Sequence, residues 1–272
     1  MDWYILLTLN PLFPILFPLY LIYRPPRTLI RLLQKKFPDV LFHRPTRDKI
    51  VALTIDDAPS EYTADILAIL EQCNAKATFF CIGSQIEGNE DILKDLVRAG
   101  HELGNHAMHD EPSFKLPISE LSTQMKLVDT MIQSIYKSVD LPPPPRYFRP
   151  GSGVFNKPMR KLVKSLGHRL ILGSIYPHDP QIHNPKVNAW HIVSMVDHGG
   201  VIIVHDRRGY TRETLRIALP KLVEMGYRVV TVSELVTRTR GWNEDQRGVA
   251  RLEARAEGRL GFISSMKSSK YG

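Results

Sequence analysis

Residues 50–59 read Ile-Val-Ala-Leu-Thr-Ile-Asp-Asp-Ala-Pro, an apolar run that ends directly in two carboxylates. A short run of this kind, followed by turn-forming residues, is typical of a strand buried inside a parallel sheet. We therefore expect a strand over residues 50–55. In parallel α/β proteins, functional side chains gather at the carboxyl ends of the strands, which is where Asp56 and Asp57 stand.

Short apolar runs and amphipathic stretches alternate from residue 50 to residue 236. The apolar runs predict strands, and the amphipathic stretches predict helices. The expected strands cover 50–55, 77–82, 102–105, 146–148, 169–173, 201–204 and 227–232, and the expected helices cover 64–73, 91–99, 119–139, 157–165, 187–196, 212–225 and 233–236. Regular alternation predicts an α/β protein, either a layered sheet or a barrel, with mainly parallel strands.

The composition describes a globular chain of 272 residues, of which 43% are hydrophobic. This content excludes a disordered chain, and the length fits one large domain with appendages. The formal net charge is +8, but residues 1–49 carry +5 and residues 237–272 carry +4, whereas residues 50–236 carry −1. Because the excess of positive charge lies outside the central body, we expect no nucleic-acid partner. The only cysteines, Cys73 and Cys81, are too few for a disulfide scaffold.

The N-terminal segment, residues 1–23, is apolar, and residues 3–23 carry no charge. That length can cross a bilayer, so we expect a membrane anchor; the alternative is an apolar arm packed on the domain, which its prolines favour. The Arg and Lys residues of the expected basic linker, residues 24–49, would hold that flank in the cytosol. The side of the membrane stays open, and a cytoplasmic location is the alternative. The expected catalytic domain is residues 50–236, followed by a basic tail, residues 237–272.

Asp56 and Asp57 are adjacent carboxylates after a buried strand, which is unfavourable unless a cation or an arginine compensates their charge. One carboxylate of such a pair can bind a metal while the other, pointing differently, accepts a proton. The alternative is an ordinary acidic helix N-terminus. The pair alone does not decide between the two.

Residues 101–111 hold three histidines and three carboxylates. His106 and Asp110 stand four residues apart, and His106 and His109 stand three apart, so a helical turn would put either pair on one face. A solvated polar loop is the alternative. Taken together with the two adjacent aspartates, the cluster favours a metal site.

Two further strand ends carry polar groups. The strand at 146–148 leads to Arg149, whose guanidinium can orient a carboxylate, and to a glycine-flanked turn at Ser152, whose backbone N–H can face an anionic oxygen. The strand at 201–204 leads to His205. Asp179 is the weakest candidate, because it also fits a plain turn former.

The order and spacing of these motifs resemble those of the NodB-type polysaccharide deacetylases, the carbohydrate esterase 4 family that includes chitin deacetylases. Residues 53–59 resemble T-F-D-D-G-P, residues 100–106 resemble G-H-E-I-G-N-H, residues 148–153 resemble F-R-P-P-Y-G, residues 201–206 resemble the late L-H-D strand, and residues 226–235 resemble the closing G-Y-R-F-V-T-V-S-E-L. The first two motifs are specific, and the others add weight because they follow in order. The resemblance covers residues 50–236 and implies a distorted (β/α) barrel.

The resemblance also implies an activity, the metal-dependent removal of acetyl groups from N-acetylglucosamine-containing glycans such as chitin or its oligomers. The implied metal ligands are Asp57, His106 and Asp110. The implied catalytic residues are Asp56 as general base, held by Arg149, His205 as general acid, tuned by Asp179, and the Ser152 amide as an oxyanion donor.

The chain departs from the family pattern at two of these positions. Asp110 stands where the family has a second metal histidine, with His109 as the rival ligand one residue earlier. Zinc is the expected metal, and an oxygen-rich ligand set also suits cobalt, nickel or manganese. Ser152 replaces a usual aromatic residue, so a backbone donor remains but an aromatic wall for a sugar does not. Two other functions stay open, namely hydrolysis of another linear or cyclic amide and a non-catalytic carbohydrate-binding role.

Overall fold

The central element of the fold is strand β2, Ile50–Ala58, in a computed structural model that describes residues 13–239. Every residue of β2 is buried. A strand covered on both faces carries apolar residues without alternation, which explains the apolar run in the sequence. The strand continues past the predicted end at residue 55. Asp56 and Asp57 therefore lie inside the strand, near its carboxyl end, rather than in a loop.

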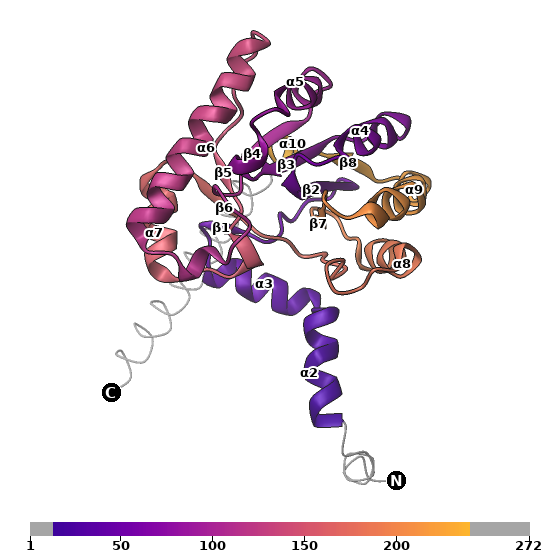
Figure 1. The fold of residues 1–272 in the computed structure, drawn as a ribbon. Helices are drawn as coiled ribbons and strands as arrows, with labels where there is room; N and C mark the ends of the chain where they lie inside the picture. The colour runs from indigo at the N-terminus through magenta and orange to yellow at the C-terminus, as the bar shows by residue number, and fades with distance from the viewer. Residues whose placement is uncertain (1–12, 240–272) are drawn as a thin grey trace, which may run out of the picture. The chain divides into compact units, whose positions relative to one another are not determined.

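The sheet is parallel throughout and follows the order β1-β6-β5-β4-β3-β2-β7, with β8 paired to β2. The strands other than β2 are β1 Val40–Leu41, β3 Ala77–Cys81, β4 Glu102–Asn105, β5 Tyr147–Phe148, β6 Arg169–Ile171, β7 Val201–His205 and β8 Arg228–Val230. Ile175, just after β6, forms a parallel bridge with Ile202 of β7. The sheet therefore curls into a half-barrel, and Figure 1 shows helices around its outer side.

The register of the strands aligns their carboxyl ends at one edge. Asp56 of β2 pairs with His205 of β7, Cys81 of β3 pairs with Asn105 of β4, and Asn105 pairs with Phe148 of β5. Residues that follow these strands therefore meet in space although they are far apart in the sequence. This edge holds the candidate site.

The helices of the half-barrel are α4 Thr63–Gln72, α5 Glu90–Arg98, α6 Ile118–Ser138, α7 Lys157–Ser165, α8 Pro185–Met195, α9 Gly209–Glu224 and α10 Val232–Arg238. The described residues also form the short 3-10 helices η1 Gly83–Gln85, η2 Ser113–Lys115 and η3 Gly151–Gly153. Asparagine side chains cap the start of α7 and α8: Asn156 accepts from the Met159 amide, and Asn184 accepts from the amides of the first turn of α8. Buried apolar side chains of α4, α5, α6, α8 and α9 belong to the main hydrophobic core.

Within the described residues, the helices that precede the sheet are α2 Phe13–Tyr23 and α3 Arg27–Lys36. Within the range that the structure describes, no helix combines the length and the apolar character needed to cross a membrane. Residues 3–12 of the expected anchor lie outside the described residues, as does the tail from residue 240. The chain falls into two compact units, Met1–Leu235 and Val236–Gly272, and the described part of the second unit contains the end of α10.

The predicted parallel α/β architecture is confirmed, and each expected strand and helix is present within a few residues of its predicted bounds. One difference concerns residues 24–49, which were expected to be a linker. They contain α3 and β1, and β1 extends the sheet by pairing with β6. Cys73 and Cys81 are both free, and Cys81 is buried in β3.

Candidate active site

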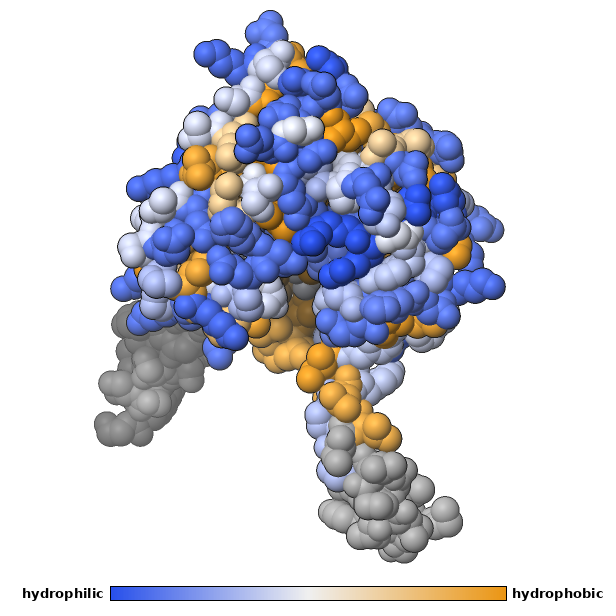
Figure 2. Space-filling model, viewed as in Figure 1, coloured by the Kyte–Doolittle hydropathy of each residue, from blue (hydrophilic) through white to orange (hydrophobic). Residues whose placement is uncertain are grey.

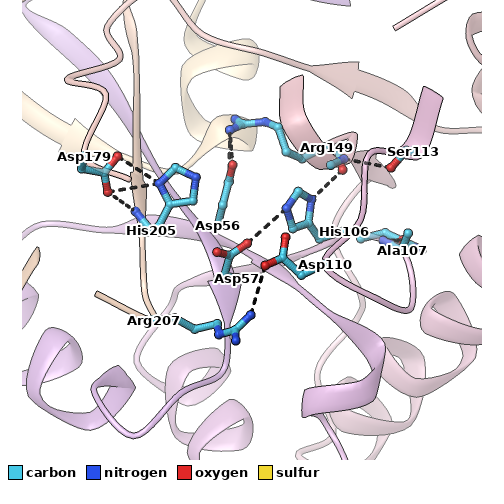
Figure 3. A network of polar contacts seen from close by, with 12 residues as sticks. Asp56, Asp57, His106, Ala107, Asp110, Ser113, Arg149, Asp179, His205 and Arg207 are labelled. Atoms are coloured by element: carbon cyan, nitrogen blue, oxygen red, sulfur yellow. Dashed lines mark hydrogen bonds and ion pairs between the residues drawn. The ribbon is translucent and has the colours of Figure 1, made fainter. Parts of the chain in front are cut away.

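A pocket at the carboxyl edge of the strands collects the predicted site residues. Seven of the eight line it, namely Asp56, Asp57, His106, Asp110, Arg149, Ser152 and His205. The eighth, Asp179, does not line the pocket but contacts the ring of His205 (Figure 3). The residues predicted from the sequence therefore lie together at one edge of the sheet. Their pairing is seen only in the structure.

Asp56 is held by a buried ion pair with Arg149. Nη1 of Arg149 donates to both carboxylate oxygens of Asp56, at 3.0 and 2.8 Å. Both residues are buried, Asp56 at 4% and Arg149 at 1% exposure. The contact that the resemblance implied is present, and it fixes the direction of the Asp56 carboxylate at the pocket wall.

The Arg149 guanidinium has a partner on every side. Nε donates to the Ile171 carbonyl at 2.7 Å, Nη2 donates to the Thr54 hydroxyl at 3.0 Å, and the Phe80 ring lies 4.7 Å from the guanidinium carbon. Burial lowers the pKa of Arg149, and the charge of Asp56 opposes that effect. An arginine stays charged under these conditions, so Asp56 keeps a fixed cation beside it.

Asp57 and His106 form a second buried contact. Oδ1 of Asp57 lies 3.4 Å from Nε2 of His106, while the His106 Nδ1–H donates to the Arg149 carbonyl at 2.7 Å. The carbonyl can only accept, so it fixes the ring orientation and leaves Nε2 facing Asp57. Burial lowers the pKa of His106, but the hydrogen bond to Asp57 and the charges of both aspartates raise it above the ordinary histidine value. The same pairing lowers the pKa of Asp57 against the effect of burial.

Asp110 lines the same pocket but pairs with an arginine. Its Oδ2 accepts from Nη1 of Arg207 at 3.2 Å, and the two side chains are 51% and 43% exposed (Figure 3). His109, the rival ligand, is exposed and does not line the pocket.

The fit of these residues to a metal ion is therefore partial. Asp57 and His106 present an oxygen and a nitrogen close together, as a divalent cation requires. Across residues 13–239, however, no three His, Cys, Asp or Glu side chains are grouped closely enough to hold a metal. A third ligand from Asp110 requires that its carboxylate leave Arg207.

His205 faces the pocket from the end of β7 and is held by Asp179. The Asp179 carboxylate accepts from the His205 backbone N–H at 3.0 Å and lies 2.9 Å from the ring Nδ1. Burial lowers the pKa of His205, but Asp179 and the charges of Asp56 and Asp57 raise it to about 9. The imidazole is therefore a proton donor at neutral pH, with its other nitrogen directed away from Asp179.

Sequence reasoning missed Asp206, which holds the loop after β2. Its carboxylate accepts from Ser60 Oγ at 2.9 Å and from Thr63 Oγ1 at 2.5 Å, and its backbone N–H donates to the Asp56 carbonyl at 2.8 Å. Asp206 is fully buried. The sequence feature that could have pointed to Asp206 is its position directly after His205.

The loops that carry the second and third motifs lock together, which sequence reasoning also missed. The Gly151 amide donates to Ser113 Oγ at 2.8 Å, and a Cβ added at Gly151 would stand 2.0 Å from the Glu111 carbonyl oxygen. Only glycine permits this approach. The contact places Arg149 and Ser152 beside the loop that carries His106.

Two pocket residues, and the sequence neighbours of two other site residues, adopt the left-handed backbone region, which is costly for residues other than glycine. They are Asp57 at φ 63°, Ala107 at φ 63°, Ser152 at φ 66° and His178 at φ 57°. Such positions cost roughly 1–3 kcal/mol each and cluster at functional sites. Their concentration around this pocket supports a site whose geometry is maintained against local strain.

Comparisons with known proteins agree with this geometry. The family described as polysaccharide deacetylase matches residues 43–171. A peptidoglycan-N-acetylglucosamine deacetylase of Bacillus cereus is 33% identical over 203 residues, which cover 72% of this chain and 92% of that protein.

Solved structures with a similar fold include both an enzyme and a pseudoenzyme. The peptidoglycan deacetylase PdaC from Bacillus subtilis superposes with a TM-score of 0.65 at 26% identity, covering 77% of this chain and 98% of that one. A carbohydrate esterase 4 family pseudoenzyme from Bacillus anthracis has a TM-score of 0.65 at 28% identity, covering 72% and 68%. A mutant of that pseudoenzyme is described as having restored enzymatic activity. The fold therefore occurs with and without catalysis.

Proposed function

The chain belongs to the polysaccharide deacetylase family, and on that premise we propose that it removes acetyl groups from N-acetylglucosamine residues of a glycan in a metal-dependent hydrolysis. The observation that carries the proposal is the meeting of three pairs in one pocket, Asp56 with Arg149, Asp57 with His106 and His205 with Asp179. Chitin oligomers remain the first substrate to test. Peptidoglycan strands are the second, because the names of several relatives refer to them.

Asp57 and His106 would hold a divalent cation, with Asp110 as the third ligand once it leaves Arg207. Such a cation lowers the pKa of water and polarises an amide carbonyl. Zinc is the first metal to test. Cobalt, nickel and manganese follow, because a ligand set with two carboxylates is richer in oxygen than one with two histidines.

The other residues divide the proton transfers between them. Asp56, held in place by Arg149, accepts the proton of the attacking water as the C–O bond forms. His205, protonated at neutral pH, delivers a proton to the departing sugar amine, which is otherwise a poor leaving group. The Ser152 amide donates to the oxyanion that develops between these steps.

The pocket also offers an apolar side to the acetyl methyl group. Leu172, Ile203 and Tyr176 line it next to the polar groups. The Tyr176 ring centre lies 6.0 Å from that of His205. A small apolar wall beside the proton donor suits an acetyl group better than a longer acyl chain.

A non-catalytic carbohydrate-binding role is the second candidate. The pairing of Asp110 with Arg207 and the pseudoenzyme among the structural relatives favour it. It differs from the first candidate in having no turnover.

The test combines metal content, acetate release and glycan binding in the full chain and in Asp56→Asn. Asp56→Asn keeps the size of the side chain and removes the general base, and Asp95→Asn on the exposed face of α5 serves as the matched control. We expect metal in all three proteins and acetate only from the unmodified chain and the control. Metal without acetate from either glycan would redirect the proposal to another amide, and glycan binding without metal would favour the non-catalytic role.

A further inference from the structure

Helix α2 presents apolar side chains to solvent on a surface with no charge. Leu16, Leu19, Tyr20 and Ile22 are 53%, 55%, 56% and 63% exposed. The sequence of α2 contains no charged residue. Figure 2 shows this helix as an apolar projection from a surface that is otherwise mainly hydrophilic. Contiguous exposure of large apolar residues marks an interaction site.

Helix α3 continues this surface with positive charge. Ile30 and Leu33 face the core, and the outward side carries Arg31, Lys35 and Leu32, with Leu32 63% exposed. Lys36 follows on the same exposed side of the helix end. The chain has no Asp or Glu from residue 3 to residue 38, so the positive charge has no acidic neighbour within that stretch.

The base of α2 is fixed to the half-barrel, which sets its direction. The Tyr23 ring centre lies 4.5 Å from that of His191 on α8, and Arg24 donates to Ser194 Oγ at 2.9 Å. Arg24 also lies over the Trp190 ring at 4.7 Å, and Trp190 is itself 57% exposed. An exposed tryptophan beside an arginine at the base of an apolar helix is typical of the boundary between lipid and water.

We propose that α2 and the outward side of α3 form a docking site for an anionic lipid surface. The apolar side chains of α2 would enter the acyl boundary, while Arg31, Lys35 and Lys36 contact phosphate headgroups. A protein partner fits less well, because the centres of protein interfaces are depleted in lysine, whereas lysines next to an apolar helix are the pattern of membrane-surface helices. The proposal does not depend on the proposed function, since lipid binding requires no catalysis.

The test is co-sedimentation of the full chain with vesicles of phosphatidylcholine alone and with vesicles that also contain phosphatidylglycerol. We expect binding to the anionic vesicles that weakens as salt rises. Leu19→Glu with Ile22→Glu should reduce binding at least about tenfold, because each adds a charge to the inserted surface. Lys35→Gln with Lys36→Gln should reduce binding to anionic vesicles about tenfold and leave binding to neutral vesicles unchanged.

Matched controls separate docking from a general effect on the protein. Leu127→Glu with Leu141→Glu changes two exposed leucines elsewhere, and Lys126→Gln with Lys137→Gln removes two exposed lysines of α6. Both should bind like the unmodified chain. Equal binding to neutral and anionic vesicles, or no binding to either, would overturn the proposal. So would a dimer in solution that Leu19→Glu dissociates while vesicles remain unbound, since a second copy would then cover the surface.

Discussion

His106 and His205 each contact a buried carboxylate, but the two contacts have different chemical consequences. His106 directs Nε2 to Asp57 and its other nitrogen to a backbone carbonyl, so neither nitrogen is free to donate to a substrate. His205 uses only Nδ1 for Asp179, which leaves Nε2 for the pocket. The first histidine is thus suited to binding a cation, and the second is suited to delivering a proton.

The first prediction concerns Asp179. Asp179→Asn removes the charge that holds the pKa of His205 at about 9. With His205 as the proposed general acid, activity should persist below that pKa and fall above it. In the variant the alkaline limb of kcat/KM should move to lower pH, toward the ordinary histidine value of 6.5. Asp95→Asn should leave the profile unchanged, and an unmoved limb in Asp179→Asn would exclude His205 as the titrating acid.

The second prediction concerns Arg207, which would compete with the proposed metal for Asp110. Arg207→Gln should raise the affinity for Zn²⁺ about two- to fivefold, a small effect because a half-exposed ion pair contributes at most about 1 kcal/mol. Asp110→Asn should lower the affinity instead. Isothermal titration of the metal-free protein measures both. The control is Arg212→Gln, which breaks a similar exposed pair with Asp65, and an equal rise in that control would contradict the competition.

At the scale of elements, the sequence predicts the long buried strands well and the short edge strand poorly. β2 and β7 are recognisable because apolar residues follow one another in them without alternation, over residues 50–53 and 201–204. β1 has two residues in a basic stretch, and its partner β6 lies more than a hundred residues later, so no local pattern marks it. The same limit applies to the site. Asp110 lies at the carboxyl edge of the sheet, as predicted. Its partner Arg207, however, lies in the loop after β7, far away in the sequence.

The third prediction concerns the loop between β2 and α4, which Asp206 holds from β7. Burial raises the pKa of Asp206 from 3.8 to about 6, although Thr63 and Ser60 donate to it. A carboxyl with a raised folded-state pKa contributes stability that is fully present below 3.8 and is lost as pH rises through about 6. Relative to Asp206→Asn, the free energy of unfolding of the unmodified chain should therefore fall by about 2–3 kcal/mol across that interval. Urea unfolding at several pH values measures this, and parallel curves for the two proteins would contradict it.

At the scale of the whole molecule, side-chain contacts across the pocket add to the strand pairing that holds the half-barrel together. Ion pairs and hydrogen bonds across the pocket join the ends of β2, β4, β5 and β7, as in the contacts of Arg149 with Asp56 and of His106 with the Arg149 carbonyl. A ligand that ties Asp57 to His106 therefore links two strand ends. Binding of such a ligand should therefore raise the free energy of unfolding of the whole fold.

The last prediction follows from that linkage. A metal bound only by the folded chain stabilises it by about 2.7 kcal/mol when present at a hundred times its dissociation constant. For a domain of this size that corresponds to a rise in Tm of about 5–10 °C. Thermal unfolding of the metal-free chain with added Zn²⁺ should show the rise, and a chelator should reverse it. Because binding must displace the proton that Asp57 favours on His106, the rise should shrink as pH falls. Asp57→Asn should lose most of the rise, and Asp95→Asn should retain it; the same rise in all three proteins would place the metal elsewhere on the molecule.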